Sequence, residues 1–171
     1  MSMMSGLLNN ILVTVGSCIL PMVVGIAVCV VCNKNQSLSK IAHIFGAFFE
    51  SFCPIVTIVF LFYCVFGQLQ LNRIVICIIG FSISFMGYMP LRYEPKNSML
   101  KNLAVNGLGL VSTAFKWSFA AGWIAVADLL KFASMQMAKT YDVASFVIVF
   151  FISFVIVFAL EMIKVFVNEK L

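Results

Sequence analysis

The stretch Phe146-Val-Ile-Val-Phe-Phe-Ile-Ser-Phe-Val-Ile-Val-Phe158 decides the fold, because it contains no charged residue, no glycine and no proline. It is the middle of a longer apolar segment, and about 20 such residues suffice for a helix to cross a membrane. β-Branched and aromatic residues favour strands in water, but a backbone in lipid must satisfy its own hydrogen bonds. A transmembrane barrel strand would alternate apolar and polar residues, which this stretch does not do. It is therefore predicted to be a transmembrane helix.

The composition extends this conclusion to the whole chain. Of its 171 residues, 63% are hydrophobic and 10% are charged, whereas an ordinary soluble domain has about 45–50% apolar and about 25% charged residues. A chain of this size cannot bury so much apolar surface in its own core, so the excess has to face lipid. Soluble enzymes, coiled coils, disordered tails and secreted disulfide scaffolds are excluded.

Five apolar stretches predict an all-α fold, a polytopic membrane helix bundle that forms a single integral-membrane domain over residues 1–171. The predicted spans cover about 11–32, 44–67, 74–90, 103–127 and 143–167, with short polar loops between them. The fourth stretch contains Lys116 next to two tryptophans, whose rings prefer the membrane interface. The sequence therefore predicts five spans and leaves four as the alternative, in which the fourth stretch does not cross.

The distribution of lysine and arginine predicts the orientation, because the cytoplasmic side carries the excess. In the five-span arrangement one side holds Lys34, Lys40, Arg92, Lys96, Lys101, Lys164 and Lys170, and the other holds Arg73, Lys131 and Lys139. The four-span model satisfies the same rule. We expect a protein of the bacterial inner membrane with its amino terminus outside, and a first apolar run that is not removed as a signal peptide. The net charge of +5 is spread over single loop residues, so a nucleic-acid partner is not expected.

Charged residues within spans are candidates for function, because a charge in hydrocarbon is costly. Lys116 and Glu50 are the possible functional charges, and one interpretation pairs them in the middle of the membrane. The other interpretation places Lys116 at the headgroup boundary and Glu50 in the first turn of a helix that crosses over 51–71, where an acid complements the helix dipole. Glu161 and Lys164 are expected to form an i,i+3 pair at the inner interface.

Cys29-Val-Val-Cys32 is a short motif with known chemistry. It resembles the cysteine pair of the four-helix membrane enzymes that generate disulfides and pass electrons to quinone. Such enzymes need a second pair in an outer loop, whereas the other cysteines here lie singly within apolar runs, and the motif is predicted to lie on the reducing side. A zinc site of Cys29, Cys32, His43 and Cys53 is disfavoured, because Cys53 would lie about 15 Å from His43 along one helix. We expect no metal and no cofactor.

Two groups of residues are possible contacts with a partner. Small residues at helical spacing allow close approach of helices within the chain or between chains, and one polar loop is rich in charge. These possible contacts are Gly80, Ser84, Ser118 and Gly122, together with the loop residues Arg92, Glu94 and Lys96.

The sequence contains no nucleophile with a base, no metal cage and no phosphate-binding loop, so a non-enzymatic protein is predicted. The favoured hypothesis is an exclusion or immunity protein of a mobile element, acting in phage superinfection exclusion, plasmid exclusion or bacteriocin immunity. Such a protein works by contacts within the bilayer, with another membrane protein or a second copy as its partner. The alternative is a small channel or transporter, or a membrane subunit of a larger apparatus. The second alternative is a membrane thiol oxidoreductase that uses Cys29 and Cys32.

Overall fold

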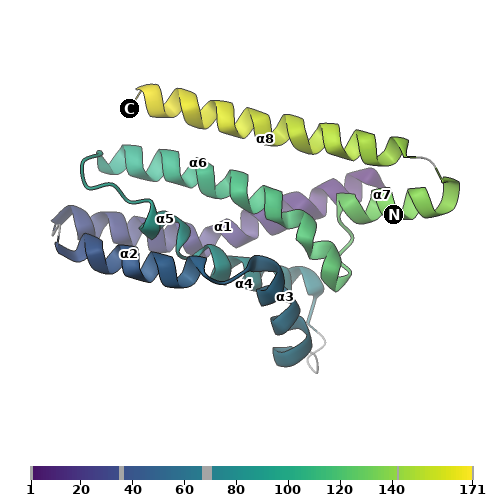
Figure 1. Cartoon of the computed structure of the whole chain (residues 1–171), viewed down its shortest axis with the longest axis horizontal. Helices are drawn as coiled ribbons and strands as arrows, with labels where there is room; N and C mark the ends of the chain where they lie inside the picture. Colours follow the sequence, from purple (N-terminus) through teal and green to yellow (C-terminus); the bar gives the residue numbers. More distant parts are fainter. Residues whose placement is uncertain (1, 35–36, 67–70, 142, 171) are drawn as a thin grey trace.

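A computed structural model of the chain describes residues 2–34, 37–66, 71–141 and 143–170. Over these residues it is all-helical, which confirms the predicted fold class. Figure 1 shows the elements, which are α1 (Met3–Lys34), α2 (Ser37–Glu50), α3 (Pro54–Phe60), the π-helical η1 (Leu61–Val65), α4 (Arg73–Phe85), α5 (Tyr88–Leu91), α6 (Met99–Ser118), the 3-10 helix η2 (Phe119–Ile124), α7 (Leu129–Thr140) and α8 (Ala144–Lys170).

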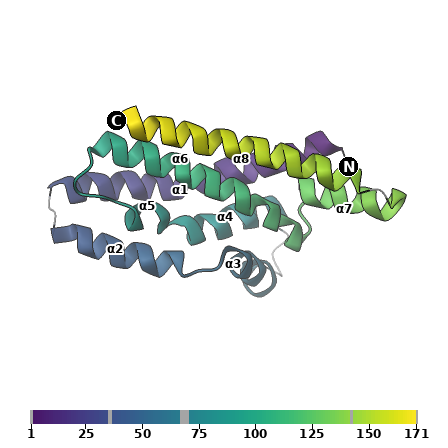
Figure 2. The same cartoon turned by 45° about the horizontal axis from the view of Figure 1, so that its top comes forward.

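Three segments of the described chain are each long and apolar enough to cross a membrane: Met3–Asn33, Arg73–Leu91 and Ala144–Lys170. Two bent pairs, α2 with α3 and η1, and α6 and η2 with α7, raise the number to five if each pair is one span. Figures 1 and 2 place the amino terminus and α7 at one end of the bundle, and the carboxyl end of α8 at the other end with the start of α6. The five-span prediction requires this arrangement of the ends.

The predicted second span, 44–67, is broken after α2, and its two halves meet at 64°. Pro54 causes the break, because it has no backbone N–H and disfavours the helical conformation of the residue before it. Cys53 accordingly has an extended backbone, with φ −64° and ψ 120°. Glu50 is therefore the last residue of α2 and not part of the first turn of a crossing helix, which corrects the prediction. Gly67 lies outside the described residues.

The predicted fourth span, 103–127, is also rearranged. Helix α6 begins a turn earlier, because the hydroxyl of Ser98 accepts a backbone N–H of the first turn. The chain leaves η2 at Ala125, which has a left-handed φ of 61°. It then starts α7 with Asp128 as the N-cap. The segment 128–142, predicted as a connection, thus contains a helix of 12 residues.

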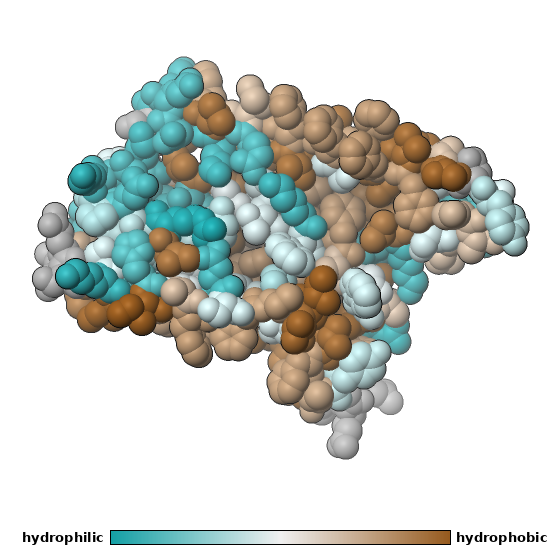
Figure 3. All heavy atoms as spheres, in the orientation of Figure 1, coloured by the Kyte–Doolittle hydropathy of each residue, from teal (hydrophilic) through white to brown (hydrophobic). Residues whose placement is uncertain are grey.

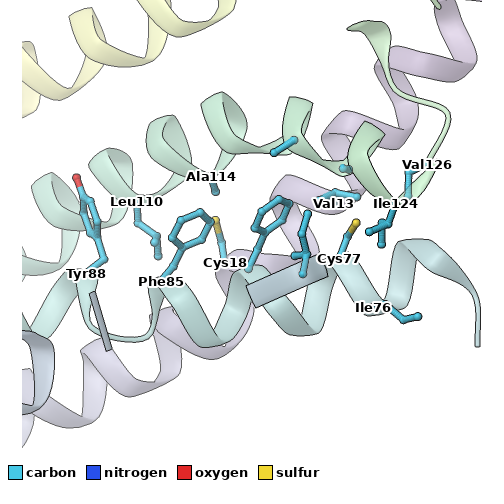
Figure 4. Close-up of a cluster of buried hydrophobic side chains, with 14 of the residues drawn as sticks. Val13, Cys18, Ile76, Cys77, Phe85, Tyr88, Leu110, Ala114, Ile124 and Val126 are labelled. Carbon is cyan, nitrogen blue, oxygen red and sulfur yellow. The ribbon is translucent and has the colours of Figure 1, made fainter. Parts of the chain in front are cut away.

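The central helix is α1, which packs along both α4 and α6. The main hydrophobic core lies between these helices, and Figure 4 shows Val13, Cys77 and Leu110 contributing to it from α1, α4 and α6. Helices α1 and α4 approach each other closely, since a Cβ atom on Gly16 of α1 would lie 2.7 Å from Ile78 Cδ1 of α4. Helix α8 is different: it packs on α6 and α7, and only 6% of its apolar 18-residue segment is buried. It lies at the edge of the bundle.

Candidate functional site: a polar seam between α6 and α8

Helix α6 carries a polar stripe along one face. Its members are three or four residues apart, and this spacing keeps them on the same side of an α-helix. On α8, polar residues are spaced in the same way over the last three turns. We name this surface the α6–α8 seam; it comprises Asn102, Asn106, Gly109, Ser112 and Lys116 of α6 with Glu161, Lys164 and Asn168 of α8.

The centre of the seam is a cluster of three charges around Glu161. One carboxylate oxygen accepts hydrogen bonds from Ser112 Oγ at 2.7 Å and from Lys116 Nζ at 3.2 Å. The other oxygen lies 3.6 Å from Lys164 Nζ. Two ammonium groups thus surround one carboxylate, which leaves the cluster with a net charge of +1. The side chains of Lys116 and Glu161 are 51% and 40% exposed, so the cluster opens onto the surface of the chain.

This cluster corrects the proposed partner of Lys116. The lysine pairs with Glu161, not with Glu50, and it does so across two helices. The i,i+3 pairing of Glu161 with Lys164 is present as predicted, in the last three turns of α8. At 1.5 Å per residue, Glu161 lies about 14 Å before the end of α8, and Lys116 lies in the last turn of α6.

A groove runs from the cluster toward the amino-terminal end of α8. Its volume is about 420 Å³, with Lys116 and Glu161 at one end, and it is otherwise lined by Phe119, Phe150, Ser153, Phe154, Val157 and Phe158. Three of the phenylalanines on α8 are stacked along the helix, with ring centroids 6.2 Å and 5.9 Å apart. This aromatic column of α8 therefore forms one wall of a groove whose end is charged.

The other end of the seam opens into a polar groove of about 360 Å³ beside the loop between α5 and α6. The loop is fixed there by Asn102, whose side chain accepts from the backbone N–H of Glu94 and donates to its carbonyl oxygen, at 3.1 Å and 2.8 Å. Asn106 donates to the carbonyl of Arg92 at 3.0 Å. Figure 3 shows hydrophilic side chains gathered at this end of the molecule, with a band that continues toward its middle.

Gly109 connects the two parts of the seam. A Cβ atom at this position would lie 2.6 Å from the Tyr88 hydroxyl oxygen and 3.4 Å from Lys164 Nζ. The absence of a side chain therefore allows the Tyr88 hydroxyl and the Lys164 ammonium to approach α6. The seam is polar from the loop before α6 to Lys116.

Glu50 belongs to a second ionic site, at the junction of α2 and α5. Its carboxylate lies 2.8 Å from an Arg92 guanidinium nitrogen. The same guanidinium lies 3.8 Å from the centroid of the Tyr88 ring and donates to the Tyr88 carbonyl at 3.2 Å. Of the other loop residues singled out in the sequence, Glu94 accepts from the Asn97 side chain at 2.9 Å, and Lys96 is exposed.

The small residues predicted to contact a partner lie mostly inside the chain. Gly80 packs against Ile58 of α3, and Ser84 is buried. Ser118 accepts a hydrogen bond from the Asn10 side chain at 2.9 Å, and the backbone N–H of Gly122 donates to the Asp128 carboxylate at 2.9 Å. These positions hold helices of the same chain together.

Asn10 and Asp128 form a buried network that sequence reasoning missed. Asn10 also accepts the backbone N–H of Leu129 at 3.0 Å, and Asp128 accepts that of Lys131 at 2.6 Å. Both side chains are 1% exposed. The N-cap position of Asp128 was a readable signal, since an acid before an apolar run starts a helix. The network ties α1 to the break between η2 and α7.

The cysteines and the histidine are not gathered into one site in the described part of the chain. Cys29 and Cys32 are buried free thiols that pack against Ala42 and Tyr93. His43 Nδ1 lies 3.0 Å from the carbonyl oxygen of Leu91. No group of three or more metal-ligating side chains occurs among the described residues.

The comparisons with known proteins identify a shared fold. Neither a protein-family model nor a curated protein matches the chain by sequence. Among solved structures, a chain from the crystal structure of an amino acid ABC transporter with histidines superposes with a TM-score of 0.76. The match covers 99% of this chain and 94% of that one, at 15% sequence identity. The chain is thus a multi-pass helical protein with the fold of an amino acid ABC transporter chain.

Proposed function

We propose that the chain is a membrane subunit of a transporter for small solutes. The observation that carries the proposal is the fold shared over almost the full length of both chains with an amino acid ABC transporter chain. This role was the first alternative derived from the sequence. It makes the chain a non-enzymatic part of a larger assembly in the membrane.

The α6–α8 seam supports a role as a subunit. Charged side chains within membrane spans normally face the interior of a bundle or a water-filled cavity, because hydrocarbon does not solvate them. Here Lys116 and Glu161 are about half exposed in the single chain. A second protein surface or a water-filled path has to cover them in the membrane, and a transporter built from several chains provides both.

The seam also favours transport over exclusion or immunity. A protein that blocks another membrane component needs apolar helices and packing faces, but it has no use for a polar lining inside the bilayer. A path for a polar solute needs such a lining. These 171 residues contain no phosphate-binding loop, so ATP-driven transport would use a nucleotide-binding domain outside them.

Uptake in the native cell tests the proposal. Cells that lack the chain are compared with cells complemented by the wild type, using a panel of radiolabelled amino acids and carboxylic acids, with and without depletion of ATP. We expect loss of ATP-dependent uptake of one solute class and recovery on complementation. The same cells are challenged with phage, conjugating plasmids and pore-forming toxins. Unchanged uptake together with lost resistance would overturn the proposal in favour of exclusion or immunity.

A further inference from the structure

We propose that the charge cluster of the α6–α8 seam binds the carboxylate of a small solute whose apolar part lies in the phenylalanine-lined groove. The inference deepens the proposed transport function, because it names the site and the chemical class of the solute. It rests on three features of the described residues: the charge balance of the cluster, its geometry, and the groove that begins at it.

The charge balance selects an anion. Glu161 neutralises one of the two ammonium groups of Lys116 and Lys164, and one positive charge is left over. This surplus positive charge attracts one further anion, because opposite charges attract each other. A cationic solute would meet a net repulsion. A site for a basic solute would need the opposite balance of charges.

The geometry leaves donors free for this anion. An ammonium group has three hydrogen-bond donors, and Lys116 Nζ makes one described hydrogen bond, to the Glu161 carboxylate. Lys164 Nζ lies at 3.6 Å from that carboxylate, which is too long for a strong hydrogen bond. Lys116, which lines the groove, thus has donors left for a second carboxylate. Lys164 does not line the groove and adds positive charge at the other oxygen of Glu161.

The groove determines the rest of the solute. It starts at Lys116 and Glu161, continues between phenylalanine side chains of α8 and Phe119, and is an open groove of about 420 Å³. Small-molecule sites of this size are mostly apolar, with a few polar groups that fix the orientation. The arrangement fits a molecule with a carboxylate at one end and a phenyl or alkyl group at the other.

Binding to the purified full-length chain in lipid nanodiscs tests the inference without a partner or ATP. Three probes share one skeleton and differ in charge: 3-phenylpropionate, 3-phenylpropanol and 3-phenylpropylamine. We expect binding in the order acid, alcohol, amine, with the acid bound roughly 10- to 100-fold more tightly than the alcohol, as a charge-assisted hydrogen bond provides. Dodecanoate separates a fatty-acid site from a site for water-soluble acids. Equal binding of acid and alcohol would overturn the inference.

Variants separate an anion site from a merely structural ion pair. Lys116→Gln neutralises the cluster and is expected to weaken binding of 3-phenylpropionate roughly 10- to 100-fold, whereas Lys116→Arg retains most of it. Glu161→Gln removes the competing carboxylate and is expected to tighten binding of the acid. If Lys116 and Glu161 form only a structural ion pair, Lys116→Gln and Glu161→Gln would both weaken the binding of 3-phenylpropionate or leave it unchanged. Lys139→Gln on α7, an exposed lysine outside the seam, is the matched control.

Helix content by circular dichroism confirms that each variant is folded. If the three probes do not bind in the expected order but ATP-dependent uptake is intact, the anion site alone is refuted. If the probes bind in the expected order but the cells show no ATP-dependent uptake, the site stands and the transport function is refuted.

Discussion

Replacement of Asn10 by alanine tests whether the buried network holds the break between η2 and α7. The Asn10 side chain donates to Ser118 Oγ at 2.9 Å and accepts the backbone N–H of Leu129 at 3.0 Å. Asn10 is 1% exposed, so neither lipid nor water can take the place of its side chain unless the structure rearranges. The first N–H groups of a helix have no partner within the helix. Asn10→Ala therefore leaves the Leu129 N–H without an acceptor.

The magnitude follows from these two hydrogen bonds. Loss of a side-chain hydrogen bond within a membrane protein costs about 0.6 kcal/mol on average. A buried donor left unsatisfied costs about 1–3 kcal/mol. Ser118 still donates to the carbonyl of Phe115 at 2.8 Å and adds little further cost. We expect Asn10→Ala to lower the free energy of unfolding by about 2–4 kcal/mol.

The assay is equilibrium unfolding by SDS in mixed micelles, followed by circular dichroism. The matched control is Asn9→Ala, because Asn9 is half-buried and its side chain donates to the carbonyl of Ala127 at 2.8 Å. We expect the control to lose about 0.5–1.5 kcal/mol. A double-mutant cycle with Ser118→Ala isolates the bond between the two side chains, with an expected coupling of about 0.6 kcal/mol. If Asn10→Ala costs no more than the control, the network does not hold the break.

Three further predictions concern packing, the cysteines and orientation. Gly87→Ala is expected to destabilise the fold strongly, because its Cβ would collide with the Gly46 carbonyl of α2. Gly107→Ala is expected to be tolerated, because its Cβ would meet only the flexible end of Met22. The thermal unfolding temperatures of the two variants are compared. Replacing both Cys29 and Cys32 by alanine is expected to leave uptake intact, and loss of uptake at normal membrane levels would return the redox hypothesis. A reporter active only in the periplasm is expected to be active in α7 and dark after the carboxyl end, and the reverse result would show that the fourth stretch stays on the cytoplasmic side.

Much of the fold was predictable, because length and hydropathy alone limit a chain in lipid to helices. The errors have local physical causes. The break before α3 follows from Pro54, which was present in the second apolar stretch but was outweighed by the hydropathy of that stretch. The helix α7 was missed because its mixed composition resembles a loop, although Asp128 marks its start.

The candidate site was predictable only in part. The polar stripe of α6 is a local pattern, and the spacing from Asn102 to Lys116 reveals it without a structure. The partner of Lys116 is not local. Lys116 and Glu161 are 45 residues apart in sequence, and hydropathy contains no information on which face of α8 turns toward α6. A single sequence therefore indicated an unusual lysine but not its partner.

The exposed surface of α8 explains why the seam needs a covering. An α-helix that is apolar on all sides is stable in lipid, and most of α8 has this character, with exposed phenylalanines and valines along its length. The seam is the exception. A charged residue at the centre of a span costs about 2.5–3.5 kcal/mol on insertion scales, and the pairing of Glu161 with two lysines offsets part of such a cost. A partner or a water-filled path that lowers this cost adds to the free energy of assembly. For comparison, micromolar binding corresponds to about 8 kcal/mol. In the proposed transporter, the charges that would receive the solute would also favour assembly along the seam.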